Sequence, residues 1–450
     1  MIMKPLAVVI LAAGQGTRMR SDLHKVLHTL AGKPMLMHLL DTVDTLDAER
    51  RVVVVGKGRE QLESALEGHG LTLAVQAEQK GTGHAVAQAA DALAGFEGTV
   101  LVLYGDTPCV DVETLQRMRS RLEAEDAPGV VVLASSPADP AAYGRVILGD
   151  GDTIAKMVEY KDATEEERAV RLCNSGMMAV AATNLFRWLS QVGNDNAAGE
   201  YYLPDIVMIA NAEGRHSVAV ECDAWQTAGI NSRTELAQVE REWQGRRRTQ
   251  AMVEGATLLD PDTVWFSADT RLGRDVLIEP SVFFGPGVTV ADGAIIRAFS
   301  HLEGALVGPG AEVGPYARLR PGAELGEKSK VGNFVEIKKA RLGAKAKANH
   351  LSYIGDAEVG AGANIGAGTI TCNYDGFFKY PTRIGEGAFI GSNSSLVAPV
   401  TVGARAIVGA GSVVTRDVDG DALGVTRAEQ KQLTGWAARF RERQSAKKGK

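Results

Sequence analysis

The sequence predicts an α/β chain in which a mostly parallel, helix-covered sheet is followed by a long connecting helix and a coil of six-residue β repeats. Three observations predict this order. Short apolar runs alternate with amphipathic stretches in the first half, a charged and glycine-poor run follows, and an aliphatic residue then recurs at every sixth position. At 450 residues the chain is too long for one ordinary core, so two domains are expected.

The first half shows the alternation of strands and helices. The predicted strands are β-branched or continuously apolar and are bounded by glycine, proline or charge: Leu6–Ala12, Val52–Val55, Leu71–Val75, Val100–Tyr104 and Val130–Ala134. The predicted helices lie between them: Met35–Leu46, Glu60–Glu67, Gly83–Leu93 and Val112–Leu122. The pattern predicts a Rossmann-like domain over residues 1–233, with helices on both faces of the sheet and ligands at the carboxyl ends of its strands.

The middle of the chain carries a run with many charges and few glycines. It begins at about Asn231 and ends at about Glu254. Such a composition suits a long exposed helix, because glycine is scarce and the many charged side chains favour solvent. We therefore expect residues 234–254 to form a helical linker between two domains.

The second half contains the clearest pattern, a six-residue period. The recurring residue is aliphatic, or aromatic at Phe284, and is usually followed by glycine: Leu272, Ile278, Phe284, Val290, Ile296, Val307, Val313, Leu319, Leu325, Val331, Ile337, Leu342, Ala348, Ile354, Val359, Ile365, Ile384, Ile390, Leu396, Val402 and Val408. A repeated flat side and a repeated corner close into a triangular coil, whose interior the stacked aliphatic residues fill. The alternative is a glycine-rich β-sandwich with chance spacing. We expect the coil, a parallel β-helix, over residues 255–450.

The period slips between Ile296 and Val307 and again between Ile365 and Ile384. A solenoid tolerates insertions only on its surface, and such loops often carry function. We expect Thr371–Tyr380 to leave the coil as a loop at the second slip.

Composition excludes several classes of protein. The net charge of −6 argues against a nucleic-acid binder, and the basic runs at residues 246–248 and 447–450 are expected to be solvated surface. Four cysteines without a C-x-x-C pair argue against a zinc ribbon and favour a reducing compartment. No signal peptide and no apolar stretch of transmembrane length are apparent, so we expect a cytoplasmic protein with no membrane insertion.

The first strand is followed directly by Leu11-Ala12-Ala13-Gly14-Gln15-Gly16-Thr17-Arg18-Met19. Small residues let backbone N–H groups approach a base or a phosphate, and Arg18 adds positive charge. Met19 replaces the third glycine of a dinucleotide fingerprint, and no Gly-Lys-Ser/Thr follows as in a P-loop. An ordinary strand–turn–helix loop is the alternative, but Lys25 places a second cation soon after it.

Two further segments point to a nucleotide. The segment Gln79–Ala85 is a glycine turn that opens a helix, and it suits a base or a ribose. Tyr104-Gly105-Asp106 ends a central strand with a carboxylate. Asp106 could cap the next helix, but a strand-end carboxylate also suits Mg²⁺ on a nucleotide phosphate.

The second half offers one candidate base. A reaction that removes a proton from its substrate needs a base, and histidine suits this task near neutral pH. His350 lies on the coil just before the second slip. A lone histidine is more often structural, but cations and amides that suit a sugar phosphate accompany this one: Arg320, Lys338, Tyr353, Asn364, Asn373 and Lys379.

These motifs, in this order, resemble a known family. The Leu11–Met19 loop, Lys25, Gln76, Gly81-Thr82 and Tyr104-Gly105-Asp106 are similar to those of sugar-1-phosphate nucleotidyltransferases. Further matches narrow the resemblance: Tyr143-Gly144-Arg145, Glu159-Tyr160-Lys161-Asp162-Ala163, Asn174-Ser175-Gly176 and Gly229-Ile230-Asn231. Over nearly its whole length the chain resembles the bacterial bifunctional N-acetylglucosamine-1-phosphate uridylyltransferase/glucosamine-1-phosphate N-acetyltransferases. The resemblance implies that the β-helix is left-handed.

The resemblance also implies roles in the first domain. Arg18 and Lys25 would face the triphosphate as catalytic cations, and Asp106 and Asn231 would hold Mg²⁺. The residues implied in binding UTP or UDP-N-acetylglucosamine are Leu11, Ala12, Ala13, Gly14, Lys25, Gln76, Gly81, Thr82, Tyr104, Gly105, Asp106, Gly144, Glu159, Asn174 and Asn231. Among them Gly144, Glu159 and Asn174 would hold the N-acetylglucosamine.

In the second domain the resemblance implies that His350 is the general base. The residues implied in binding glucosamine 1-phosphate are Arg320, Lys338, Tyr353, Asn364 and Lys379. The residues implied in binding acetyl-CoA are Ala367, Asn373, Tyr374, Ser392, Ala410 and Arg427, and Arg427 lies where the family pattern is loosest. By analogy with the family, a homotrimer with acetyltransferase sites at the subunit boundaries is expected.

Three functions remain to be weighed. A bifunctional enzyme would acetylate glucosamine 1-phosphate and then uridylylate the product. A monofunctional sugar-1-phosphate nucleotidyltransferase would carry the β-helix only as a structural part. A silent nucleotide-sugar sensor would need no metal pair, so Asp106 with Asn231 argues against it. His350 and the Asn373-Tyr374 loop favour the bifunctional enzyme, because a structural coil needs neither.

Overall fold

The computed structural model describes residues 4–448. The chain divides into two compact units, residues 1–246 and residues 247–450. The division falls within a 21-residue helix, α8 (Arg233–Val253).

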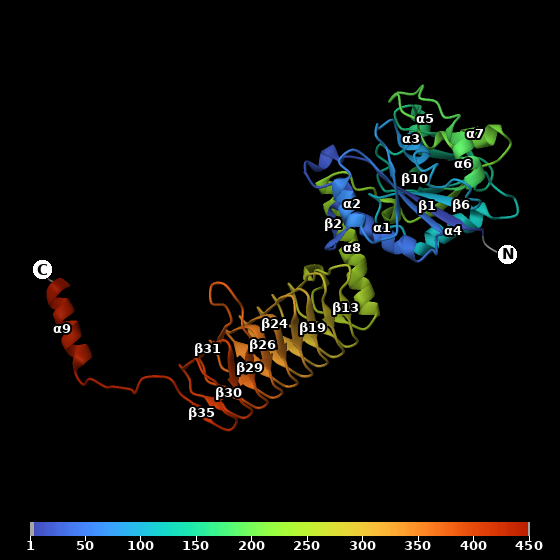
Figure 1. Cartoon of the computed structure of the whole chain (residues 1–450). Helices are drawn as coiled ribbons and strands as arrows, with labels where there is room; N and C mark the ends of the chain where they lie inside the picture. Colours follow the sequence, from blue (N-terminus) through green and yellow to red (C-terminus); the bar gives the residue numbers. More distant parts are fainter. Residues whose placement is uncertain (1–3, 449–450) are drawn as a thin grey trace. The chain divides into compact units, whose positions relative to one another are not determined.

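The first unit is built on one twisted sheet with the strand order β11-β7-β10-β6-β1-β4-β5 (Figure 1). Its strands are β1 (Leu6–Ala12), β4 (Arg50–Val55), β5 (Thr72–Val75), β6 (Thr99–Tyr104), β7 (Val130–Ser135), β10 (Cys173–Ala181) and β11 (Val218–Cys222). Only β10 runs antiparallel to its neighbours in this order. A hairpin of β8 (Arg145–Leu148) and β9 (Ile154–Val158) joins the sheet through β10. The mostly parallel sheet is confirmed.

Helices cover both faces of this sheet, as predicted. Alternate residues of β1 pack into two separate apolar clusters, because successive side chains of a strand point to opposite faces. One cluster includes α1 (Met35–Asp44), α2 (Glu60–Leu66) and α4 (Val112–Leu122). The other includes α3 (Thr82–Ala87), α6 (Ala182–Leu189) and α7 (Asp205–Ala212). The helix expected over residues 83–93 was predicted too long, since α3 ends at Ala87 and turns follow it.

The remaining short elements of this unit are η1 (Thr17–Met19), η2 (Lys25–Leu27), β2 (Thr29–Leu30), β3 (Lys33–Pro34), α5 (Glu165–Arg168) and η3 (Ala224–Thr227). At the start of α8, the Ser232 hydroxyl accepts the Glu235 amide, and the Glu235 carboxylate accepts the amides of Asn231 and Ser232. This capping box fixes the backbone at the helix N-terminus. Asn231 is therefore held immediately before the helix.

The second unit is a parallel β-helix with three sides, which Figure 1 shows as a stack of short strands. One side is β12 (Thr257–Leu258), β14 (Leu277–Ile278), β17 (Ile295–Ile296), β20 (Glu312–Val313), β23 (Lys330–Asn333), β25 (Lys347–His350), β27 (Asn364–Ile365), β30 (Phe389–Ile390), β33 (Ile407–Val408) and β35 (Leu423–Gly424). We call this side the first side.

The other two sides merge into one sheet, because β24 and β26 each continue around a corner. The strands are β13 (Arg271–Leu272), β15 (Phe283–Phe284), β16 (Thr289–Val290), β18 (His301–Leu302), β19 (Ala305–Val307), β21 (Arg318–Leu319), β22 (Ala323–Leu325), β24 (Glu336–Leu342), β26 (Tyr353–Val359), β28 (Ile370–Cys372), β29 (Thr382–Ile384), β31 (Ser395–Val397), β32 (Val400–Val402) and β34 (Val413–Val414). The unit also contains η4 (Pro261–Thr263) and the exposed α9 (Trp436–Lys448). Residues 449–450 of the basic tail lie outside the described residues.

The six-residue period places the core of the coil. Every recurring residue from Ile278 to Val408 is buried, and only Leu272, in the first coil, is partly exposed. In a coil, each of these side chains stacks on the one above, so the interior is a continuous apolar column. The predicted triangular coil is confirmed.

Both slips of the period have a simple structural cause. At the first, Leu302 is fully buried and occupies the missing position, and the corner after it is one residue shorter. At the second, the buried Thr371 occupies the aliphatic position and bonds the Gly355 amide. The expectation that Thr371 and Cys372 begin the loop was therefore wrong, since both lie in β28. The loop starts at Asn373 and projects from the stack in Figure 1.

One corner of the coil carries exposed apolar side chains. Phe299, Tyr316, Phe334 and Leu351 succeed one another in adjacent coils, each with a positive φ. The three aromatic rings stack with centroid separations of 4.9 and 5.3 Å. We call these four residues the corner ridge. It separates the first side from the side that contains β18, β21 and the start of β24.

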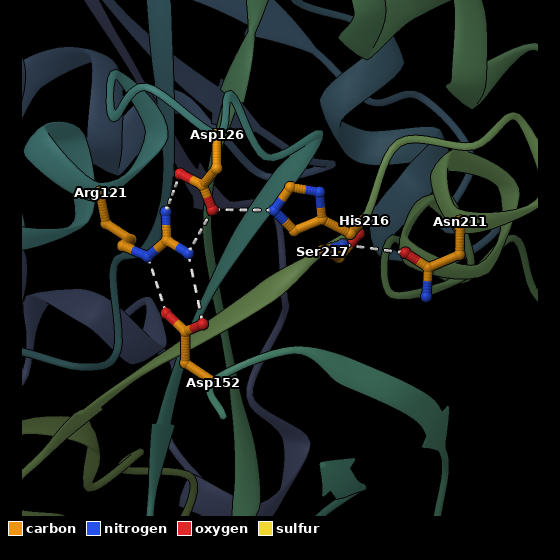
Figure 2. Close-up of polar contacts among 6 residues, drawn as sticks. All are labelled: Arg121, Asp126, Asp152, Asn211, His216 and Ser217. Carbon is orange, nitrogen blue, oxygen red and sulfur yellow. Dashed lines mark hydrogen bonds and ion pairs between the residues drawn. The ribbon is translucent and has the colours of Figure 1, made fainter. Parts of the chain in front are cut away.

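A network of charges ties the first unit together at the amino ends of β7 and β11. The Arg121 guanidinium lies between two carboxylates, 2.7 Å from both Asp126 and Asp152 (Figure 2). His216 Nε2 lies 3.0 Å from Asp126, and the Ser217 amide donates to Asn211 of α7. The Arg121 guanidinium holds the pKa of the Asp126 and Asp152 carboxyls below their usual range. The network therefore joins α4, α7, β9 and β11.

We expect Arg121→Met to lower the apparent unfolding temperature of the first unit by about 2–4 °C at pH 7. A carboxyl whose pKa is depressed in the folded state stabilises the fold above its ordinary pKa of about 4, and this stabilisation is lost as the pH falls further. The difference between Arg121→Met and wild type should therefore shrink below about pH 4. Thermal unfolding over a pH series measures it, and Arg215→Met, an exposed neighbour, is the control. An equal difference at every pH would contradict the account.

Candidate active sites

The first candidate site is a cavity of about 270 Å³ at the carboxyl ends of β1 and β6. Parallel strands bring their carboxyl ends to one edge of the sheet, so loops far apart in sequence meet there. The cavity is lined by Leu11, Ala12, Ala13, Gly14, Lys25, Val26, Gln76, Gln79, Gly81, Thr82, Ala85, Tyr104, Asp106 and Glu200. It therefore gathers most of the side chains that the sequence suggested for a nucleotide.

Two glycines shape this cavity because larger residues do not fit. Gly16 has a φ of +66°, and a Cβ there would lie 2.5 Å from Cβ of Lys25. Gly81 has a φ of +108°, and a Cβ there would lie 2.5 Å from the Tyr201 carbonyl oxygen. Both positions combine a left-handed backbone with close packing, which only glycine tolerates. The first brings Lys25 against the glycine loop, and the second opens α3 toward the cavity.

Lys25 joins the two residues expected to hold a metal. Its Nζ lies 2.5 Å from Asp106 Oδ2 and 3.0 Å from Asn231 Oδ1. The Ile230 amide donates to the Asp106 carbonyl at 3.0 Å, which brings the residue before α8 to the end of β6. A carboxylate and an amide oxygen around one cation position suit Mg²⁺, which takes few protein ligands and completes its shell with phosphate and water. Among residues 4–448, no three His, Cys, Asp or Glu side chains gather into a metal-binding group.

A second cavity of about 360 Å³ contains the residues suggested for the sugar. Gly144, Glu159 and Asn174 all line it, with Asp162, Tyr202 and Asp205. Asn174 precedes a bulge in β10, where its Oδ1 accepts the Gly176 amide at 2.8 Å. Burial raises the pKa of the Glu159 carboxyl, and the nearby Asp205 and Asp162 raise it further.

Not every expected residue reaches these cavities. Arg18 is exposed on η1 and does not line either of them. Gly105 lines neither, and its amide donates to the Leu11 carbonyl, so it holds β6 and β1 together. Conversely, sequence reasoning included Gln79 in the glycine-turn segment but gave it no role of its own, and its Nε2 donates to the Ala13 carbonyl at 2.6 Å. Its place in the glycine turn before Gly81 was the available signal. Glu200, from a loop far along the chain, gave none.

In the β-helix, the expected base and most acetyl-CoA residues form one column. Each member of this column lies two residues after a position that pairs between successive first-side strands. The members are His350, Ala367, Ser392 and Ala410. The carbonyls of the first three residues accept hydrogen bonds from backbone amides of the next coil, those of Gly368, Asn393 and Gly411 in that order. The carbonyl of the fourth, Ala410, accepts a hydrogen bond from the Arg427 side chain at 2.5 Å. We call these residues the acetyl column. It continues past Ala410 to Arg427 along one corner of the coil.

The expected sugar-phosphate residues divide between two sides of the coil. Arg320, Lys338 and Lys379 lie close enough for the two other cations to lower the pKa of the Lys338 ammonium. Tyr353 lies beside them, because it pairs in register with Glu336, the ion-pair partner of Arg320 at 2.8 Å. Asn364 instead lies on the first side with His350, opposite Lys347. Glu336 escaped the sequence reasoning, which looked only for cations and amides around the phosphate.

The loop after β28 is anchored at its base and exposed at its tip. Asn373 is buried, and its side-chain amide donates to Asp356 at 2.5 Å. Tyr374 is exposed and pairs across the loop with Lys379. The loop thus places Tyr374, expected to contact acetyl-CoA, beside Lys379, expected to contact the sugar phosphate.

Together, the fold and the sites define a two-domain transferase, with a cavity at the strand ends of the first unit and a hexapeptide-repeat coil as the second. Residues 8–189 match the family of MobA-like NTP transferase domains, and residues 381–416 match the bacterial transferase hexapeptide family. Of the described residues, none form a helix long and apolar enough to cross a bilayer.

Curated relatives match the chain from end to end. The bifunctional protein GlmU of Sphingopyxis alaskensis is 64% identical over 444 residues, covering 99% of this chain and 98% of the relative. That of Rhizorhabdus wittichii is 65% identical over 445 residues, with 99% and 98% covered. That of Zymomonas mobilis is 56% identical over 446 residues, with 99% of each covered. The chain belongs to the GlmU family of bifunctional transferases, which confirms the family inferred from the sequence motifs. The monofunctional alternative is disfavoured.

We expect Lys25→Met to bind Mn²⁺ about tenfold more tightly than wild type without nucleotide, because the ammonium and the metal need the same two oxygens. In the same variant, UTP-dependent release of pyrophosphate should fall by about 100-fold or more, because the cation expected to face the phosphates is lost. Electron paramagnetic resonance of free Mn²⁺ measures the first effect. Arg18→Met, which removes a cation outside the cavity, should leave Mn²⁺ affinity unchanged. Equal Mn²⁺ affinity in Lys25→Met and wild type would refute the competition.

Proposed function

We propose that the chain makes UDP-N-acetylglucosamine in two steps on separate domains. Residues 255–450 transfer an acetyl group from acetyl-CoA to glucosamine 1-phosphate, and residues 1–233 then transfer a uridylyl group from UTP to N-acetylglucosamine 1-phosphate. The observation that carries the proposal is the presence in one chain of two built sites. Lys25, Asp106 and Asn231 meet in the first unit, and His350 heads the acetyl column in the second.

In the first domain, a phosphate oxygen of N-acetylglucosamine 1-phosphate attacks the α-phosphorus of UTP. One P–O bond forms, the bond to the β-phosphate breaks, and pyrophosphate leaves with the electron pair. Asp106 and Asn231 would hold Mg²⁺, which supplies positive charge to the phosphates when bound. Lys25 adds its own charge, and the lining residues position the two substrates, so electrostatics and orientation provide the catalysis. Gly144, Glu159 and Asn174 hold the sugar.

In the second domain, His350 removes a proton from the amine of glucosamine 1-phosphate, and the nitrogen attacks the thioester carbon. The C–N bond forms, the C–S bond breaks, and the proton passes to the CoA thiolate. Arg320, Lys338 and Lys379 neutralise the sugar phosphate, and Tyr353 and Asn364 orient the sugar. Acetyl-CoA lies along the acetyl column, with Asn373 and Tyr374 of the loop beside it.

We also propose that three copies assemble, with each acetyltransferase site between two of them. Two features support this proposal. His350 and Asn364 lie on one side of the corner ridge, whereas Arg320, Lys338 and Tyr353 lie on the other side. The ridge itself is apolar and exposed, with Tyr316 at 48% and Phe334 at 57% exposure. If the ridges of three copies met on an axis, the cations of one copy would face His350 of the next.

Residence in the cytoplasm stays a prediction.

The function is tested by release of free CoA thiol from acetyl-CoA and glucosamine 1-phosphate. We expect His350→Ala to reduce this release by about 100-fold or more, since a general base contributes that much. UTP-dependent release of pyrophosphate from N-acetylglucosamine 1-phosphate should be intact in the same variant. No thiol release from folded wild type would leave only the nucleotidyltransferase.

The assembly is tested at the centre of the corner ridge. We expect Tyr316→Glu to convert the trimer to smaller species, because a buried unpaired charge opposes association. The rate of thiol release should fall in proportion to the fraction of protein that remains trimeric. Sedimentation velocity reports the state of assembly. Leu148→Glu, which charges an exposed aliphatic position of the first unit, should remain trimeric. A Tyr316→Glu protein that is still trimeric would show that the interface between copies does not lie at the corner ridge.

A further inference from the structure

His350 has one side-chain partner that no assigned role accounts for. Its Nδ1 lies 2.5 Å from Oδ1 of Asn333. An amide oxygen only accepts hydrogen bonds, so Nδ1 must carry the proton. In a neutral imidazole, the lone pair then resides on Nε2, which is the nitrogen that can take a proton from a substrate.

The coil imposes this pair rather than leaving it to chance. Asn333 ends β23 and His350 ends β25, and the two residues are in register, 17 residues apart. Each is followed by a corner residue with positive φ, Phe334 at 55° and Leu351 at 51°. The Leu351 amide donates to the Asn333 carbonyl at 3.0 Å. The backbones around both side chains are therefore fixed relative to each other by the stacked coils.

The chemistry of the partner matches the task of the base. A carboxylate at this position would stabilise the imidazolium and keep the base protonated at higher pH. A neutral amide orients the ring and selects its tautomer without that charge. The charged groups that share the cavity beside this pair are Arg297, Glu312, Lys330 and Lys347. Glu312, the one acid among them, already pairs with Arg297 and with Lys330 at 3.0 Å.

We propose that Asn333 is the positioning residue of the acetyltransferase base. It holds the His350 ring with Nδ1 protonated and Nε2 free to accept the proton of the substrate amine. Asn333 does not touch the reacting atoms; it acts through His350. The proposal rests on the proposed role of His350 in acetyl transfer and adds the group that keeps this base in its reactive tautomer.

The test compares Asn333→Ala and Asn333→Asp in the full-length protein with acetyl-CoA and glucosamine 1-phosphate as substrates. We expect Asn333→Ala to lower kcat by about 10- to 100-fold with KM within about twofold of wild type, because the base is misplaced while the binding residues stay. Asn333→Asp should recover most of that kcat and move the acid limb of the pH–rate profile to higher pH, because its carboxylate stabilises the imidazolium. A merely structural asparagine would give neither the recovery nor the displaced limb.

A second readout needs no turnover. Nitrogen-15 chemical shifts of labelled histidine distinguish the two tautomers, and we expect His350 to change from Nδ1–H in wild type toward Nε2–H in Asn333→Ala. Asn349→Ala is the matched control, since its side-chain oxygen lies in the same cavity without a hydrogen-bond partner among the described residues. It should leave the tautomer unchanged.

The outcomes separate this proposal from the function on which it rests. Loss of thiol release in His350→Ala with wild-type kcat and tautomer in Asn333→Ala would overturn the positioning role alone. Full thiol release in His350→Ala would overturn the role of His350 itself, and with it this proposal. Uridylyl transfer at the wild-type rate in all variants shows that the first unit is intact, and unchanged KM values in acetyl transfer show the same of the coil.

Discussion

The register of the parallel coils is the constraint on which the second unit depends. An aliphatic side chain at every sixth position fills the interior, and each strand pairs with the same position of the next coil. Because the register is fixed by burial, the outward residues are fixed too, and they line up as columns. The corner ridge is one such column, and the acetyl column, which Asn333 extends by one coil through its pairing with His350, is another. The residues of a functional site on this fold are thus neighbours in successive coils and are not neighbours in the sequence.

In the first unit, the positions of the site residues are also fixed by the backbone, but by the ends of parallel strands and not by stacked coils. Its site is assembled where parallel strands end, so the glycine loop after β1 and the carboxylate after β6 meet although they lie 90 residues or more apart. The site is completed by Asn231, which the capping box of α8 holds in place. Lys25 then links the two oxygens with its ammonium. Charge placement in this site is thus set by backbone elements, with little freedom left to the side chains.

Much of the fold and of the sites could be predicted because the patterns involved are local. The strand Leu6–Ala12 and the helix Val112–Leu122 have the predicted bounds, since burial and amphipathic spacing decide them within a few residues. The antiparallel β10 with its bulge at Asn174 was not predicted, because the pairing that defines it comes from β6 and β7. Thr371 was predicted to lie in the loop because a hydroxyl-bearing residue is not expected in an apolar core. Its burial is possible because its hydroxyl accepts a hydrogen bond from the Gly355 amide, one coil away. Asn333 and Glu336 were missed for the same reason, since their partners lie in neighbouring coils.

The capping box before α8 also has a consequence for where the first unit can be divided. Asn231 belongs to the segment that starts the long helix, and its amide is held by Glu235, a residue inside that helix. The sheet and both of its apolar clusters are complete before this point. A third, smaller apolar cluster around Met35 and Ile230 is covered by Leu236, Val239 and Trp243 of α8. A chain ended just before Asn231 would therefore keep the two clusters of the sheet but lose this cover, together with one of the two oxygens that contact Lys25. The first half of α8 is therefore part of the first unit in two respects, the packing of its core and the oxygen that Asn231 places beside Lys25.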